Sequence, residues 1–178
     1  MESRRTSHNQ RGGFTLLEMM VAAAVGFLVL AGGVSVYVFS MRSFVSMANY
    51  SDLNEKSRYA SDLISRDIRC CISVASATTN QLVLNEPDGP TAYVYDSNSA
   101  TLVRSKNGEA RVLLSGVNSL SFNLYQRPDN LASYEQFPVG TPANAKLIAF
   151  QWSCSRTLGA SGNNSETLQA ALVEMRNQ

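Results

Sequence analysis

The longest run of apolar and small residues lies near the N-terminus and predicts a membrane-spanning helix. Its uncharged part, from Met19 to Met41, is 23 residues long. As an α-helix it measures roughly 34 Å at 1.5 Å per residue, and a hydrocarbon layer is about 30 Å thick. No proline occurs before Pro87, so we expect the helix to continue beyond the span.

From Arg42 to about Ile72 the pattern becomes amphipathic. An apolar stripe at helical spacing consists of Leu53, Ala60, Ile64 and Ile68, with Leu63 beside it. Opposite charges stand four residues apart at Asp52–Lys56, Arg58–Asp62 and Asp62–Arg66. We expect these charges to lie on a solvated face, while the stripe packs on a sheet.

Beyond Ile72 the pattern changes to short β-rich runs separated by turn residues. Asn107-Gly108 predicts a tight hairpin, because a type I′ turn needs positive φ at both central residues. The 19 residues from Arg127 to Ala145 show little periodicity and read as a long loop. The predicted strands are Gln81–Asn85, Thr91–Asp96, Ala100–Ser105, Ala110–Ser115, Val117–Gln126, Lys146–Arg156 and Thr167–Met175, where a short helix is the alternative for the last. The fold class is therefore α+β, with one long N-terminal helix packed on an antiparallel β-sheet.

Glu18 is unusual because it lies just inside the apolar run. A carboxylate in a membrane segment costs on the order of 2.5–3.5 kcal/mol and therefore implies a partner, or a shallow position near the headgroups. An ordinary secretory signal would be cleaved after small residues such as Ala22–Ala24, but 17 strongly apolar residues follow them. Cleavage at the polar-to-apolar boundary, between Gly13 and Phe14, would instead create an amine four residues before Glu18. That amine is a candidate cation for Glu18 of the same chain or of a neighbouring chain.

Charge and composition narrow the function classes. From Arg42 onward 12 basic residues balance 12 acidic ones, so nucleic-acid binding has no support. The only histidine, His8, lies before Phe14 and would be lost if the chain were cleaved between Gly13 and Phe14. The cleaved protein would then have no histidine for catalysis or for metal binding. No glycine-rich phosphate loop is present. We therefore expect no enzyme, no catalytic residues, no metal and no cofactor.

Three cysteines are present at Cys70, Cys71 and Cys154. In an exported protein either Cys70 or Cys71 is a reasonable disulfide partner for Cys154, whereas adjacent cysteines rarely bridge one another. Buried free thiols are an equally good interpretation.

The segment Gly13-Phe14-Thr15-Leu16-Leu17-Glu18, behind a short basic leader and ahead of a long apolar run, resembles the class III signal of type IV pilins and type II secretion pseudopilins. The resemblance implies cleavage between Gly13 and Phe14 by prepilin peptidase and N-methylation of Phe14. It also implies that Glu18 acts in subunit assembly. The resemblance covers about 30 residues closely.

Looser resemblances point to J-type minor pseudopilins and PilW-like minor pilins. They rest on Arg66–Arg69, on Ser115–Phe122 and on Leu168–Asn177. The expected function is a minor subunit of a type II secretion pseudopilus, in its tip or initiation complex. The alternatives are a minor pilin of a type IV pilus and a membrane-anchored binding protein that never polymerises.

The expected organisation is a cleaved leader (1–13), a transmembrane assembly helix (14–41) and a periplasmic globular domain (42–178). Arg4, Arg5 and Arg11 in the leader favour a cytoplasmic N-terminus by the positive-inside rule. The expected partners are prepilin peptidase, other minor pilin-like subunits and inner-membrane lipid.

Overall fold

The computed structural model describes residues 13–126, 137–139, 141–157 and 163–176. The leader up to residue 12, residues 127–136 and residue 140 of the expected loop lie outside this described part. One long helix, α1, spans Leu16–Cys70. The other elements are β1 (Ser73–Thr78), β2 (Gln81–Glu86), β3 (Gly89–Asp96), β4 (Thr101–Lys106), β5 (Glu109–Ser115), β6 (Val117–Gln126), β7 (Phe137–Pro138), the 3₁₀ turn η1 (Pro142–Asn144), β8 (Leu147–Thr157) and β9 (Asn163–Glu174).

Helix α1 is continuous, as the sequence predicts, and it runs through two compact units. The first unit comprises Met1–Phe44 and the second Val45–Gln178. Every described residue of the first unit is exposed. Helix α1 contains one stretch that is long and apolar enough to cross a membrane. Among the described residues the apolar side chains of this stretch are exposed, which is expected of a lipid-facing or subunit-facing surface.

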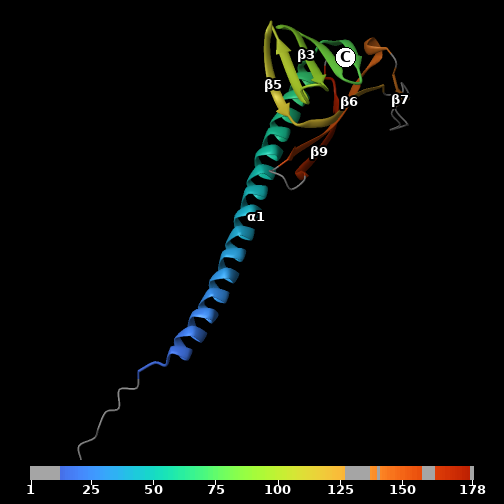
Figure 1. Cartoon of the computed structure of the whole chain (residues 1–178). Coiled ribbons are helices and arrows are strands. Elements are labelled where there is room, and N and C mark those ends of the chain that lie inside the picture. Colours follow the sequence, from blue (N-terminus) through green and yellow to red (C-terminus); the bar gives the residue numbers. More distant parts are fainter. Residues whose placement is uncertain (1–12, 127–136, 140, 158–162, 177–178) are drawn as a thin grey trace, which may run out of the picture. The chain divides into compact units, whose positions relative to one another are not determined.

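The strands of the second unit form two antiparallel sheets (Figure 1). Sheet A has the order β1-β2-β3-β4-β5, and sheet B has the order β7-β6-β8-β9. The seven predicted strands are confirmed, and the last run is a strand rather than a helix. The sequence analysis missed β1, whose sequence SVASAT has mostly small side chains, and it missed β7 and η1 inside the expected loop.

Two predicted local features, a hairpin turn and a set of charge pairs on α1, have different outcomes. The hairpin turn between β4 and β5 is confirmed, because Asn107 and Gly108 have φ values of 53° and 84°. Of the three charge pairs expected on α1, Lys56 Nζ lies 3.0 Å from Asp52 Oδ2. The Arg58–Asp62 and Asp62–Arg66 pairs are absent from the ion pairs of the described residues.

The single sheet expected from the sequence is divided at Gly116. This residue separates β5 from β6 and has a φ of 74°, a region that residues with a side chain rarely adopt. Its backbone oxygen accepts a hydrogen bond of 2.8 Å from the Ser155 N–H. A Cβ atom at position 116 would lie 2.5 Å from the Ser155 oxygen. The chain therefore leaves sheet A and enters sheet B through a turn that only glycine fits.

The second part of α1, from Val45 onward, supplies the surface on which both sheets bury their inner faces. The predicted stripe is confirmed, since Leu53, Ala60, Ile64 and Ile68 are buried and Leu63 is partly buried. Sheet A contributes Leu82, Leu84, Tyr93, Leu102 and Leu114 to this core, and sheet B contributes Leu120, Phe122, Ile148, Phe150 and Trp152. Phe150 and Trp152 stack with their ring centroids 5.2 Å apart.

Substitution of Gly116 should destabilise the second unit more than substitution of another glycine with positive φ. Gly108→Ala is the matched control, because Gly108 also has positive φ but a Cβ atom there would meet nothing within 4 Å. We expect Gly108→Ala to cost about 1–2 kcal/mol from backbone strain, and Gly116→Ala to cost at least about 2 kcal/mol more from the added clash. Denaturant unfolding of the full chain in detergent, followed by near-ultraviolet circular dichroism, measures both. Equal costs would show that the close approach to Ser155 does not constrain the turn.

Candidate functional site: the start of α1 and the end of α1

The start of α1 is a capped helix terminus. Gly13, Phe14 and Thr15 precede the first helical residue. Thr15 Oγ1 accepts a hydrogen bond of 3.3 Å from the Glu18 N–H, and the Met19 N–H donates to the Thr15 oxygen at 3.2 Å. Thr15 is therefore the N-cap, and Glu18 occupies the third helical position. This is the S/T-x-x-E pattern of a capping box, which the sequence analysis missed although Thr15-Leu16-Leu17-Glu18 carries the signal.

Glu18 is exposed in the first turn of α1. A negative charge at this place interacts favourably with the positive end of the helix dipole. Phe14 lies four residues earlier and is 78% exposed. The arrangement therefore presents an accessible carboxylate close to the chain position at which the expected cleavage would create an amine.

The N-terminal segment matches a known family model. Residues 8–34 match the prokaryotic N-terminal methylation motif. This match supports a type IV pilin-like or pseudopilin precursor, and it points to a structural subunit that prepilin peptidase processes and that assembles with pilins. No curated protein and no solved structure matches the chain.

The three cysteines are free thiols in the structure. Cys70 is exposed, whereas Cys71 and Cys154 are fully buried. The Cys71 thiol donates a hydrogen bond of 3.1 Å to the Ile68 oxygen and lies 3.5 Å from Met175 Sδ. The structure forms no bond between Cys154 and either of the other two, and the disulfide stays a prediction.

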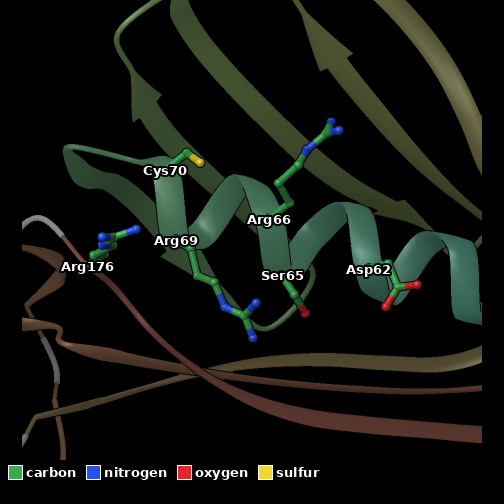
Figure 2. Close-up of a pocket in the computed structure, with 6 residues that line it drawn as sticks. All are labelled: Asp62, Ser65, Arg66, Arg69, Cys70 and Arg176. Atoms are coloured by element: carbon green, nitrogen blue, oxygen red, sulfur yellow. The ribbon is translucent and has the colours of Figure 1, made fainter.

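A pocket lies at the C-terminal end of α1 (Figure 2). It has a volume of about 430 Å³. Its lining residues are Asp62, Ser65, Arg66, Arg69 and Cys70 of α1, together with Arg176, which follows β9. Three guanidinium groups thus share the pocket with a single carboxylate. Of these residues, Asp62 and Arg66 were expected on a solvated face, and no sequence pattern placed Arg176 beside them.

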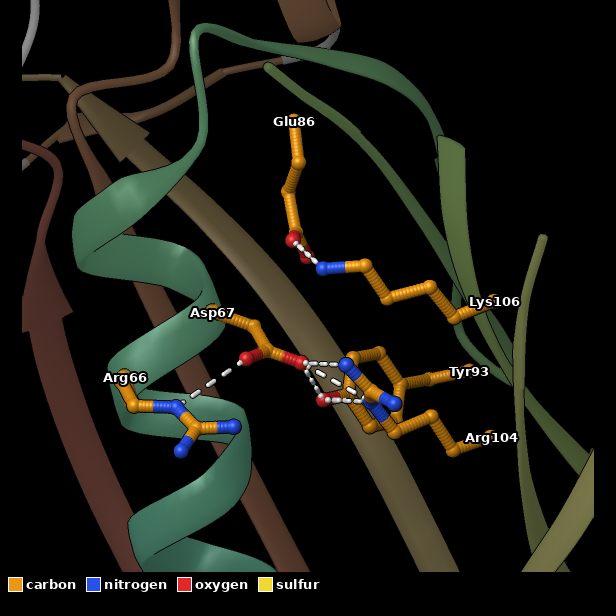
Figure 3. Close-up of polar contacts among 6 residues, drawn as sticks. All are labelled: Arg66, Asp67, Glu86, Tyr93, Arg104 and Lys106. Carbon is orange, nitrogen blue, oxygen red and sulfur yellow. Dashed lines mark hydrogen bonds and ion pairs between the residues drawn. The ribbon is translucent and has the colours of Figure 1, made fainter. Parts of the chain in front are cut away.

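Asp67, in the same part of α1, is buried and joins the helix to sheet A (Figure 3). Its Oδ2 accepts hydrogen bonds from Tyr93 Oη at 2.6 Å and from Arg104 Nε at 2.9 Å. Arg104 Nη2 also lies 2.8 Å from Asp67 Oδ2. Burial raises the pKa of Tyr93, and the hydrogen bond to Asp67 raises it further. The sequence-based expectation of a solvated face concerned other charges of α1, and it made no statement about Asp67, whose partners come from β3 and β4.

A second polar pair lies beside this cluster on sheet A. Lys106 Nζ donates a hydrogen bond to Glu86 Oε2 (Figure 3), and the Glu86 side chain is only 5% exposed. Glu86 Oε1 and Thr91 Oγ1 are buried without a hydrogen-bond partner among the described residues. Thr91 pairs across the sheet with Leu84 on one side and Lys106 on the other. Within the described residues no group of acidic, cysteine or histidine side chains has the arrangement of a metal site.

Sheet B is joined to α1 by a separate set of contacts. Trp152 Nε1 donates a hydrogen bond of 2.8 Å to Ser57 Oγ, which satisfies both groups inside the core. Gln169 Nε2 donates to Ser61 Oγ at 3.3 Å. Arg156 Nη1 lies 2.9 Å from Asp52 Oδ2, at a more exposed position. The buried polar residues of α1, which are Ser57, Ser61 and Asp67, thus lie between the apolar residues of the stripe. Each of them is hydrogen-bonded to one of the two sheets.

Removal of the Asp67 charge should strongly destabilise the second unit. Asp67→Asn leaves the Arg104 guanidinium, which is 18% exposed, without its counter-charge, and breaking such a pair costs about 3–5 kcal/mol. Asp52→Asn is the control, because its ion pairs with Lys56 and Arg156 are more exposed, so its loss should destabilise the protein much less. Unfolding free energies of the two variants in the same detergent test this difference. The double variant Asp67→Asn/Arg104→Met should recover part of the loss, and an additive loss would contradict the pairing.

The buried thiols predict a loss of stability in alkali. Burial raises the pKa of Cys71 to about 11, and the Glu86 carboxylate adds to this shift. Burial also raises the pKa of Cys154 to about 11. The folded state holds these two thiol protons more tightly than the unfolded state does. The two thiols should therefore cause no change in the free energy of unfolding below pH 9. It should fall between pH 9 and 11, by roughly 2–3 kcal/mol for each thiol.

Unfolding measured under reducing conditions from pH 8 to 11 checks this prediction. Cys154→Ala should remove the contribution of Cys154 to the slope and leave the contribution of Cys71 in place. An unchanged slope in Cys154→Ala would show that this thiol titrates equally in the folded and unfolded states.

Proposed function

We propose that the chain is a minor pseudopilin of a type II secretion system, which assembles through α1 into the tip or initiation complex of the pseudopilus. The observation that carries the proposal is the start of α1. There the expected cleavage position, an exposed carboxylate and the beginning of an exposed apolar helix follow one another within the matched motif. The assignment to a minor pseudopilin rests further on the resemblance of Arg66–Arg69, Ser115–Phe122 and Leu168–Asn177 to J-type subunits.

The proposed organisation follows from the same segment. Residues 1–13 form a leader that prepilin peptidase removes, after which Phe14 is N-methylated. Residues 14–41 hold the subunit in the inner membrane before assembly, and residues 42–178 form the periplasmic domain. The basic leader keeps the N-terminus on the cytoplasmic side.

In this proposal Glu18 forms an ion pair with the Phe14 amine of a neighbouring subunit. An exposed carboxylate surrounded by lipid is unfavourable until a cation reaches it. The amine of its own chain lies one helical turn away, but a pair between chains also determines the axial position of one helix against the next. The helix dipole and the Thr15 cap hold the carboxylate at the helix start in the isolated subunit.

Replacement of Glu18 by glutamine tests the assembly role without removing the cap. Glutamine also fits the third position of a capping box, so Glu18→Gln changes the charge and leaves the helix start intact. We expect the variant to be inserted and cleaved, with a mature N-terminus at Phe14, but to be recovered with other pilin-like subunits at least about tenfold less than the wild type. Intact mass measures processing, and co-purification from co-expressing membranes measures assembly.

Thr15→Ala is the matched control, because it removes the cap and keeps the charge; we expect its assembly to remain near the wild-type level. Recovery of partners at wild-type yield with Glu18→Gln would refute the role of Glu18 in assembly, whereas a wild-type chain recovered without pilin-like partners would favour a solitary membrane-anchored binding protein. Deletion of the gene separates the two filaments: loss of protein secretion supports the pseudopilus, whereas loss of surface pili with intact secretion supports a PilW-like minor pilin.

A further inference from the structure

The pocket at the end of α1 has an excess of unpaired positive charge. Arg69 and Arg176 have no ion-pair or hydrogen-bond partner among the described residues. Arg66 approaches a carboxylate only weakly, with its Nε 3.5 Å from Asp67 Oδ1 and its side chain 68% exposed. Asp62 is the one acid of the lining, and no described ion pair connects it to these arginines. In a chain whose formal net charge is only +1, this local excess is a distinct feature.

Stabilisation of the helix end explains only part of this cluster. Basic side chains in the last turn interact favourably with the negative end of the helix dipole, and Arg69 lies in that turn. Arg176, however, comes from the segment after β9, and the fold brings it to the pocket from 106 residues farther along the chain. In Figure 2 the side chains of Arg66 and Arg69 extend in different directions from α1, and Arg176 lies on the segment after β9.

We propose that this pocket is a docking site for an acidic side chain of a neighbouring pilin-like subunit. Guanidinium groups bind carboxylates through paired, charge-assisted hydrogen bonds, and arginine is enriched among the residues that dominate protein interfaces. The pocket volume of about 430 Å³ accommodates one such side chain with its neighbouring backbone. The inference rests on the proposed function, which supplies the neighbouring subunit.

A protein carboxylate fits the position of the pocket better than a lipid phosphate. Within the second unit the helix contains 18 residues from Val45 to Asp62, which correspond to a rise of about 25 Å. The pocket therefore lies several helical turns beyond the residue at which the second unit begins. Complementary charge at such a site chiefly accelerates and orients the encounter between subunits.

Cys70 provides a reporter inside the pocket, because its thiol is exposed and it is a lining residue. Iodoacetate and iodoacetamide are similar in size but differ in charge, and both react with the same thiolate. The rate with the anionic iodoacetate divided by the rate with the neutral iodoacetamide therefore reports the electrostatic potential at Cys70. Both rates are measured by peptide mass spectrometry on the full chain in detergent. We expect Arg69→Gln/Arg176→Gln to lower this ratio about threefold to tenfold, and Arg58→Gln, outside the pocket, to leave it unchanged. An unchanged ratio in the double variant would overturn the electropositive site.

Docking itself is tested in membranes that contain the co-expressed pilin-like subunits of the same assembly. Alkylation of Cys70 by the neutral iodoacetamide should be at least tenfold slower in the recovered complex than in the chain alone. The protection should be lost in Arg69→Gln/Arg176→Gln and retained in Arg58→Gln. Recovery of the wild-type complex with an unprotected Cys70 would overturn the docking site while leaving the proposed function intact. Failure of the wild type to form any complex would instead overturn the proposed function and the docking site with it.

The isolated chain distinguishes a protein carboxylate from a free anion. An acetylated peptide of alternating glutamate and glycine should protect Cys70, and its glutamine analogue should not. If inorganic phosphate at the same concentration protects Cys70 as well as the acidic peptide does, the pocket is a small-anion site and the assignment to a neighbouring subunit is wrong.

Discussion

The buried stripe on α1 is the constraint on which the second unit depends. Both sheets bury their inner faces against one helix, so each side chain of the stripe must suit the sheet that it meets. Apolar positions at Leu53, Ala60, Ile64 and Ile68 supply the contact area. Ser57 and Asp67, which are also buried, direct hydrogen bonds to Trp152 of sheet B and to Tyr93 of sheet A. Because an unpaired buried polar group is costly, these contacts disfavour alternative positions of the sheets along the helix.

The elements with strong local patterns were predictable from the sequence. The continuous helix, the alternating strands and the turn at Asn107-Gly108 follow from periodicity and from backbone preferences, and the structure confirms them. The strand at Ser73–Thr78 was missed because small residues give no clear alternation. The division into two sheets depends on the contact between Gly116 and Ser155, which are far apart in the sequence.

The polar contacts of α1 were least accessible to sequence reasoning. Asp67 lies between two arginines in the sequence and resembles the solvated residues around it. Its actual partners, Tyr93 and Arg104, are 26 and 37 residues away. Arg176 joins the pocket for the same reason, through a strand order that no local pattern reveals. By contrast, Gly13, Phe14 and Glu18 lie within one segment of six residues, so their proposed roles could be inferred from the sequence alone.

The two ends of α1 place different demands on their charges. At the start, the Glu18 carboxylate is favoured by the helix dipole and lies in a capped turn, and in the proposed assembly a neighbouring subunit supplies its cation. At the other end, Arg69 is favoured by the dipole of the same helix, but Arg176 gains little from it and remains without a partner in the described part of the chain. If both ends contact neighbouring subunits, the first contact raises the effective concentration for the second. Two individually weak ionic contacts on one chain would then select a subunit by charge at both positions, with little dependence on the strength of either alone.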